Sequence, residues 1–256
     1  MAYYGKTEII LCDSYQQLGR IAASDVAKTL RRVLSSQVEA RIIFAAAESQ
    51  VTFLDSLAVE AGIDWNRVTC FNMDEFWGPD LPVSVTCSYQ ISTQLYDKVR
   101  PKAWYAPLYS APDPVMEARR FAEVFRSQLP IDILCQGIGR SGHLALNEPG
   151  AELLEDVESV RVVDVCEEST HQLMDDPQFK VAAMSLRKGI TLTIPSLMSA
   201  RHHFTMVPLV TKRSIMSKVL RLQAVSHMLP ASIIMNYSGR LYMDQDSYPG
   251  DYFLRQ

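Results

Sequence analysis

The feature that most constrains the fold of this 256-residue chain is the alternation of short apolar segments with longer segments of helical periodicity. Segments 41–46 and 131–136 are apolar over most of their length, which is typical of strands buried on both faces of a parallel sheet. The helical segments between them are long enough to provide crossover connections. The alternation therefore predicts an α/β fold with a mainly parallel sheet and helices on both faces, a Rossmann-like three-layer sandwich.

Periodicity and capping residues set the expected bounds of the elements. Ser14 is the predicted N-cap of the first helix, Pro114 lies in the first turn of a later one, and Thr211 caps the last. The expected helices are 15–34, 49–61, 88–99, 114–128 and 212–223, and the expected strands are 7–12, 41–46, 67–73, 131–136, 160–165, 189–194, 203–210, 232–236 and 240–243.

Length and composition limit the classes of protein that the chain can belong to. It is 48% hydrophobic, and because no linker or repeat divides it, residues 1–256 are expected to form one domain. A net charge of −4 gives no general attraction to nucleic acid or to a membrane surface, so neither is an expected partner. No run approaches the roughly 20 apolar residues of a membrane-spanning helix. The absence of a signal-peptide pattern and the five scattered cysteines predict a cytoplasmic protein.

Side chains that can take part in chemistry follow three expected strands, at 45–50, 72–75 and 137–148. Because ligands bind beyond the carboxyl ends of strands in a parallel sheet, these three segments are expected to converge. Their convergence, more than any single motif, favours an enzyme.

Asp74 and Glu75 come directly after an apolar strand. An acidic pair in such a position is often no more than a solvated strand end. Partial burial can instead tune a carboxyl group to act as a general base, which makes Asp74 a catalytic candidate. Since neighbouring side chains point in different directions, only one of the two is expected to face a substrate.

The segment Gly137-Ile-Gly-Arg-Ser-Gly142 matches the GxGxxG pattern of dinucleotide-binding folds, and Asp164 follows about 20 residues later. That pattern requires a helix to begin at the third glycine. Here Pro149 and Gly150 follow too soon for a regular crossover helix. Nucleotide binding is therefore not expected, and no cofactor is predicted.

His143 and Glu148 flank a short apolar run just beyond this glycine turn. An isolated histidine is more often structural than catalytic. The place of His143 at a strand end, with carboxylates available, favours a proton shuttle instead, since an imidazole beside a carboxylate exchanges protons near neutral pH.

A cationic segment at 211–213 is expected to open a helix directly after a strand. Backbone N–H groups, the helix dipole and the Lys212 ammonium group would suit a phosphate, although a solvated cation explains the pattern equally well. Ser49 opens a helix in the same way, but Glu48 beside it would repel an anion. The histidine pair 202–203 points to opposite faces of a strand, so no metal site is predicted.

Taken together, these segments resemble the glucosamine-6-phosphate deaminase/isomerase family. The matching motifs are Phe71-Asn-Met-Asp-Glu75, Gly137-Ile-Gly-x-x-Gly-His143 and Ala145-x-Asn-Glu-Pro149, with weaker matches at 190–194, 200–201 and Lys212. Their order and spacing hold from about residue 8 to residue 246.

The resemblance implies a deaminating isomerisation that needs neither cofactor nor metal. By analogy, His143, supported by Glu148, would assist opening of the sugar ring, and Asp74 would move a proton between C2 and C1, giving the enol from which ammonia leaves. The partner would be a small-molecule sugar phosphate, and the family includes both monomers and homo-oligomers. The candidate substrate-binding residues are Ser49, Glu75, Gly139, Arg140, Ser141, Asn147 and Lys212.

Three positions depart from the pattern of this family. The loop after the second strand is usually a phosphate cradle of the type Thr-Gly-Gly/Ser-Thr-Pro, whereas this chain has Ala46-Ala-Glu-Ser-Gln50. An acid usually lies two residues before the histidine, where this chain has Ser141. An arginine that contacts phosphate is missing near Thr170. These departures indicate an altered substrate, altered chemistry or lost activity.

Three functions follow from these observations. The leading hypothesis is an aldose–ketose isomerase or deaminase that acts on an amino-sugar phosphate. A hydrolase similar to the sugar-phosphate lactonases would share the glycine–histidine turn, but the motifs Asn147-Glu-Pro149 and Asn72-Met-Asp-Glu75 favour the deaminase. A sensor that binds a sugar phosphate without turnover would explain Glu48, Ser141 and Thr170.

Overall fold

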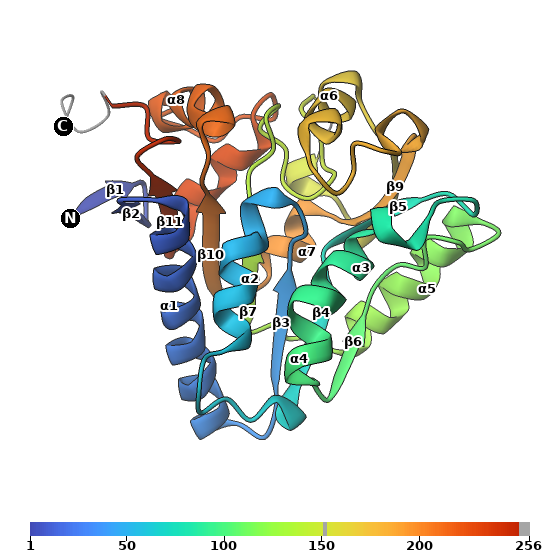
Figure 1. Ribbon diagram of the computed structural model, residues 1–256, viewed down its shortest axis with the longest axis horizontal. Coiled ribbons are helices and arrows are strands. Elements are labelled where there is room, and N and C mark those ends of the chain that lie inside the picture. The colour runs from blue at the N-terminus through green and yellow to red at the C-terminus, as the bar shows by residue number, and fades with distance from the viewer. Residues whose placement is uncertain (151–152, 251–256) are drawn as a thin grey trace.

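The central element of the structure, a computed structural model, is an eight-stranded sheet (Figure 1). The structure describes residues 1–150 and 153–250. Within these residues every neighbouring strand pair of the sheet is parallel except β1/β2, which confirms the predicted α/β class. In spatial order the strands are β1 (Ala2–Tyr4), β2 (Thr7–Cys12), β11 (Gly239–Asp244), β10 (His202–Val207), β7 (Ile133–Gln136), β3 (Ala40–Phe44), β4 (Val68–Asn72) and β6 (Ala103–Tyr105).

Helices cover both faces of this sheet, as predicted (Figure 1). Alternation along β3 explains why both faces are apolar, since Ile42 and Phe44 pack with the α1 and α2 side while Ile43 packs with the α5 and α8 side. No helix in the described ranges is both long and apolar enough to cross a membrane. The helices are α1 (Tyr15–Ser36), α2 (Val51–Ala58), α3 (Cys87–Ile91), α4 (Asp97–Val99), α5 (Pro114–Ser127), α6 (Glu167–Asp175), α7 (Ile194–Met198) and α8 (Arg213–Arg221).

Close contact between α1 and α2 positions the loop that follows β3. Ser14 caps α1 as predicted, because its hydroxyl accepts a hydrogen bond from the Gln17 N–H at 3.2 Å. Gly19 of α1 lies against Thr52, and a Cβ at Gly19 would come within 2.5 Å of the Thr52 backbone. The absence of a side chain at this position allows α2 to pack directly on α1.

A second, antiparallel sheet lies beyond the large one and was not predicted from the sequence. It consists of β5 (Asp74–Trp77), β9 (Lys188–Leu192) and β8 (Val160–Asp164). Met73 joins the two sheets: its N–H donates to Phe44 O at 3.0 Å, and its carbonyl accepts from Leu192 N at 2.8 Å. The chain therefore passes from one sheet to the other through a single residue.

Three further predictions of local structure differ from the observed elements. Segment 232–236 belongs to a 3₁₀ helix, Pro230–Asn236, because a short apolar run can be buried in a helical turn as readily as in a strand. Thr211 does not cap a helix; it lies in a 3₁₀ turn, Val210–Lys212, that precedes α8. The helix expected at 88–99 is interrupted by a π-helical turn, Ser92–Tyr96.

Candidate active site

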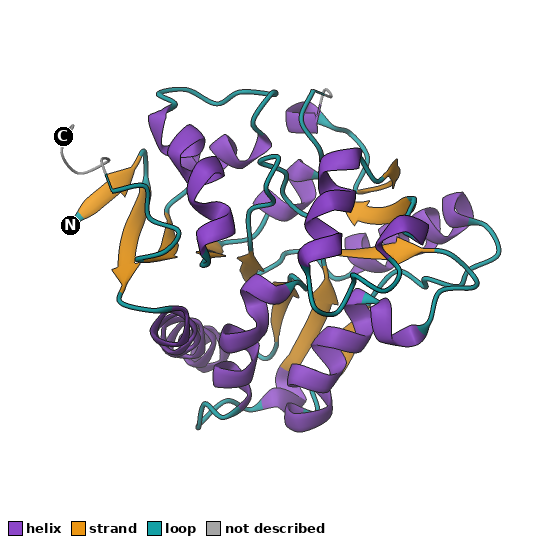
Figure 2. Cartoon of the chain, turned by 45° about the horizontal axis from the view of Figure 1, so that its top comes forward, coloured by secondary structure: helices purple, strands orange, loops and turns teal. Residues whose placement is uncertain are grey.

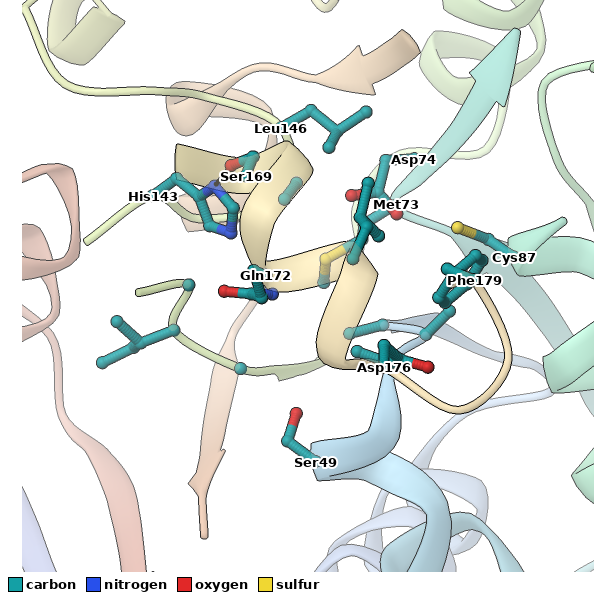
Figure 3. A pocket seen from close by; sticks show the side chains of 18 of the residues that line it. Ser49, Met73, Asp74, Cys87, His143, Leu146, Ser169, Gln172, Asp176 and Phe179 are labelled. Atoms are coloured by element: carbon teal, nitrogen blue, oxygen red, sulfur yellow. Dashed lines mark hydrogen bonds between the residues drawn. The ribbon is translucent and has the colours of Figure 1, made fainter. Parts of the chain in front are cut away.

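A cavity lies at the carboxyl ends of β3, β4 and β7. Figure 2 brings this edge forward and shows helices and loops gathered over it, and Figure 3 shows the cavity itself. Five of the predicted site residues line it: Asp74, His143, Ser49, Gly139 and Lys212. The other lining residues are Ala45, Ala46, Ala47, Met73, Phe76, Cys87, Gly137, Ile138, Ala145, Leu146, Ser169, Gln172, Leu173, Asp176 and Phe179.

Asp74 is the first residue of β5, and its pairing with Thr191 of β9 fixes its backbone. Its side chain is nearly buried in the cavity wall (Figure 3). Burial, and then the charge of Glu75, raise the pKa of Asp74 to about 7. A carboxyl group with such a pKa can accept and release a proton near neutral pH, which a general base must do.

Glu75, predicted as a substrate-binding residue, lies outside the lining of the cavity. Its carboxylate accepts hydrogen bonds from the N–H groups of Phe76 (2.9 Å), Cys87 (2.8 Å) and Ser88 (2.8 Å), and from the Ser88 hydroxyl at 2.6 Å. Alternation along β5 turns it away from the side that Asp74 occupies. Its role in this structure is to hold the start of α3 against the small sheet.

His143 projects into the cavity from the turn after β7 (Figure 3). Its Nδ1 lies 2.8 Å from Glu148 Oε1. Because a carboxylate can only accept, this contact assigns the proton of the neutral ring to Nδ1 and leaves Nε2 as a free base. Nε2 lies over Gly139, where a Cβ would come within 1.6 Å of it. Only glycine at 139 leaves room for the ring.

Glu148 is held behind His143 by two serine hydroxyls. Ser141 donates to Glu148 Oε2 at 2.6 Å, and Ser169 of α6 donates to Oε1. Burial opposes ionisation of Glu148, but the hydrogen bonds from His143 and the two serines lower its pKa to about 2. Ser141, where the resemblance leads one to expect an acid, therefore supports the carboxylate that orients the histidine.

We expect Gly139→Ala to lower turnover by about 10²-fold, because displacement of a reacting group by about 1 Å has effects of that size. The alanine methyl group would overlap the His143 ring and force it away from Glu148. A matched design compares Gly139→Ala alone with Gly139→Ala in a His143→Ala background. Gly139→Ala should lower the melting temperature when His143 is present but not in the His143→Ala background. An equal fall in both backgrounds would show that the added methyl group does not contact the His143 ring.

Lys212 is buried at one end of the cavity, where a smaller chamber adjoins it. The Lys212 ammonium group donates to Gln172 Oε1 at 3.2 Å. Burial and then Arg140 lower the pKa of Lys212 to about 7, while Asp176 and Glu48 act in the opposite direction. The Lys212 amine therefore carries its proton only part of the time at neutral pH.

The other predicted site residues have intramolecular partners. Arg140 lies in the chamber beside Lys212, and its guanidinium forms an ion pair with Asp175 at 2.6 Å. Asn147 is buried and donates to the carbonyls of Leu144 and Leu192 at 2.9 Å each, which ties the glycine turn to the small sheet. In this structure Asn147 positions the turn and does not line the cavity.

Sequence reasoning missed the contribution of α6. Ser169, Gln172 and Asp176 project from this helix and its end into the cavity (Figure 3). Their spacing of three and four residues places them on one helical face. That spacing was the available signal, but the helix is too short and polar to be recognised by apolar periodicity.

The glycine turn itself does not open a helix, as the closely following Pro149 indicates. The Gly139 N–H donates to His143 O at 3.0 Å, and the Gly142 N–H to Gly139 O at 3.0 Å, so the segment closes on itself. Gly142 has a φ of 90°, which a glycine adopts without strain. In the described part of the chain, no three His, Cys, Asp or Glu side chains are grouped as metal ligands would be.

Comparison with known sequences shows two groups of relatives. The chain is 31% identical over 153 residues to a 6-phosphogluconolactonase of Pseudomonas aeruginosa, covering 58% of this chain and 63% of that enzyme, so it spans less than two thirds of that relative. It is 27% identical over 191 residues to a glucosamine-6-phosphate deaminase of a Geobacillus species, covering 73% of each chain. A deaminase of Streptococcus pyogenes is 26% identical over 219 residues, covering 85% of this chain and 90% of that enzyme.

Solved structures show the same fold. A monomeric glucosamine-6-phosphate deaminase superposes with a TM-score of 0.80 at 22% identity, covering 94% of this chain and 98% of that one. A 6-phosphogluconolactonase from Thermotoga maritima has a TM-score of 0.74 at 16% identity, covering 93% and 99%. The family model for glucosamine-6-phosphate isomerases and 6-phosphogluconolactonase matches residues 13–243. Since that match spans most of the sequence, the chain belongs to the glucosamine-6-phosphate isomerase/6-phosphogluconolactonase family.

Proposed function

We propose that this chain is an aldose–ketose isomerase that releases ammonia from an amino sugar. The observation that carries the proposal is the pairing of two proton-transfer groups in one cavity: a nearly buried Asp74 whose pKa is raised to about 7, and His143 with its free Nε2. Isomerisation requires proton transfers at two places on the substrate, and two separate groups can serve them.

His143 would act on the sugar ring. The imidazole takes the proton of the C1 hydroxyl as the C1–O5 bond breaks, and it returns a proton to O5, which gives the open-chain aldehyde. The Glu148 carboxylate stabilises the imidazolium form during this exchange, because it remains ionised at neutral pH.

Asp74 would act on the open chain. Its carboxylate removes the C2 proton, and the electron pair of that bond forms the C1=C2 double bond. The π pair of the C1=O bond moves onto O1, which takes up a proton lost by the 2-ammonium group, and an enol results. Return of the proton to C1 gives an imine at C2. Addition of water to C2 and cleavage of the C2–N bond then release ammonia and leave a ketose.

The proposal predicts ammonia release from 2-amino-2-deoxyhexoses in equal amount with ketose. A panel of such sugars, each as the free sugar and as its 6-phosphate ester, is the direct test, with both products measured. The 2-hydroxy sugars of the same configuration are the matched controls, since they can isomerise but have no ammonia to lose. Ketose formation from the controls alone would replace the deaminase with a simple isomerase, and no product from any sugar would reject the proposal.

A second candidate function is lactone hydrolysis, which the 31% identity to a 6-phosphogluconolactonase favours. It requires one base to activate water and has no need of a second proton-transfer group such as Asp74. Acid release from a hexonolactone or its 6-phosphate, with no ammonia from any amino sugar, would select this function. Saturable binding of a sugar or its phosphate without either reaction would instead support a sensor that binds its ligand without turnover.

We also propose that the enzyme acts in the cytoplasm. All five cysteines are free, and four of them are buried. Free thiols persist in a reducing compartment, where disulfides are rare. The state of the cysteines therefore suits the cytoplasm.

A further inference from the structure

The loop between β3 and α2 faces the Lys212 end of the cavity, but the backbone N–H groups of Ala47 and Glu48 already have partners. The Glu48 N–H donates to Asp176 Oδ2 at 3.0 Å. The Ala47 N–H donates to Gln90 Oε1 at 2.9 Å. An incoming anion would have to compete with these acceptors, one of which is itself a carboxylate.

Asp176 is built into the cavity wall. Its carboxylate accepts from Glu48 N through Oδ2 and from Gln178 N at 2.9 Å through Oδ1. The residue is only 8% exposed and lines both the main cavity and the chamber at Lys212. Figure 3 shows it at the end of α6, beside Ser49. The position that faces the loop N–H groups is therefore filled by a fixed negative charge of the protein.

The charges around this end do not favour a phosphate. Lys212 and Arg140 are the cations that line the chamber, and Glu48 and Asp176 are the carboxylates that line it. Arg140 is also paired with Asp175 outside the chamber. The cations are therefore already matched by carboxylates, so the two negative charges that a phosphate ester can carry would have no counter-charge of their own and would be repelled by Glu48 and Asp176. A fully ionised phosphate ester also has no O–H group that could donate a hydrogen bond to the Asp176 carboxylate.

We infer that this site takes an amino sugar whose terminal carbon bears a free hydroxyl in place of a phosphate ester. A hydroxyl can donate to a carboxylate and accept from the Lys212 ammonium group at the same time, so it satisfies both kinds of group found here. A cationic terminal group would gain from Asp176 but would lie beside Lys212 and Arg140, whereas a neutral hydroxyl meets no like charge. The inference rests on the proposed function for the reaction, but it concerns the opposite end of the substrate.

Binding can be measured without turnover in the Asp74→Asn variant. Calorimetric titration with glucosamine and galactosamine, each with and without a 6-phosphate, should give at least about tenfold tighter binding of the free sugars, the effect of one well-made polar contact. Tighter binding of either 6-phosphate than of its free sugar, or binding of neither form, would overturn the inference.

Variants that remove one negative charge test whether the carboxylates cause the preference for the free sugar. Asp176→Asn and Glu48→Gln each remove one negative charge and keep the shape, so each should tighten binding of the 6-phosphate by about tenfold relative to the free sugar. Asp164→Asn is the matched control, because it makes the same change of net charge at an exposed residue outside the cavity. If Asp176→Asn fails to fold, Glu48→Gln still decides. Equal shifts in the control and the cavity variants would contradict the inference.

The two proposals fail in different ways. Faster ammonia release from the 6-phosphate than from the free sugar would overturn this inference and support the proposed reaction. Preferential binding of the free sugar with no ammonia release would reject the reaction and support the inference.

Discussion

The Asp74→Asn enzyme is expected to lose turnover by about 10²–10⁴-fold, the usual effect of removing a general base, and to bind its amino sugar almost as well as the wild type. The amide keeps the shape of the carboxyl group but cannot take the C2 proton. Product formation under saturating sugar gives the first quantity, and calorimetric titration gives the second. Wild-type turnover in this variant would exclude Asp74 as the base.

The same variant should be more stable than the wild type at alkaline pH. The pKa of Asp74 is raised to about 7 in the folded state and is about 4 in the unfolded chain, so the fold loses stability as pH rises between these two values, and the loss is nearly complete above about pH 7. The melting temperatures of the two proteins should therefore differ most at pH 8 and converge near about pH 4, below which the group is protonated in both folded and unfolded chains.

Glu75→Gln is the matched comparison, and its pH dependence should have the same sign. Burial raises the pKa of Glu75 to about 7, although the hydrogen bonds from Ser88, Cys87 and Phe76 act in the opposite direction. The amide would also lose these hydrogen bonds and place an NH₂ group against donors at every pH, so this variant should melt below Asp74→Asn throughout. A stability difference from the wild type that becomes more unfavourable to Glu75→Gln as pH rises would contradict this assignment.

Glu148→Gln should lower the free energy of unfolding at pH 7 by about 3 kcal/mol, the value that corresponds to a pKa lowered from 4.5 to about 2. Because the folded-state pKa lies below the unfolded one, this contribution is complete above about pH 5 and is lost as pH falls towards 2. Turnover should fall as well, since the imidazolium of His143 loses its charged partner.

Urea denaturation at a series of pH values measures this contribution. The difference between Glu148→Gln and wild type should be largest at pH 7 and vanish near pH 2. Glu123→Gln, at an exposed position on α5, is the control and should change stability little at any pH. A difference that does not depend on pH would mean that packing, and not the charge of Glu148, stabilises the turn.

The large sheet could be predicted because its signal is local. Strands such as β3 and β7 are apolar over most of their length, which follows from their burial on both faces, and the catalytic candidates follow such strands directly. Asp74 and His143 could therefore be assigned to one edge of the sheet from the residue pattern alone. Their presence in one cavity agrees with that expectation.

The small sheet and α6 could not be predicted because their signals are not local. β8 and β9 resemble the strands of the large sheet in sequence, and only their pairing with each other and with β5 makes them antiparallel. Ser169 and Asp176 are ordinary polar residues of a short helix until the fold brings them to Glu148 and Glu48. Likewise, no feature of the neighbouring sequence indicates that the Glu75 carboxylate accepts hydrogen bonds from the N–H groups at the start of α3.

Because Met73 alone joins the two sheets, the number of residues in this junction determines which carboxyl group faces the cavity. One residue separates the last paired position of β4 from the first of β5, and successive side chains of β5 face opposite sides. Deleting or inserting one residue here would exchange the orientations of Asp74 and Glu75. The length of this junction is therefore more strictly constrained than the identity of its side chain. Related sequences should differ at position 73 by substitution, and not by insertion or deletion.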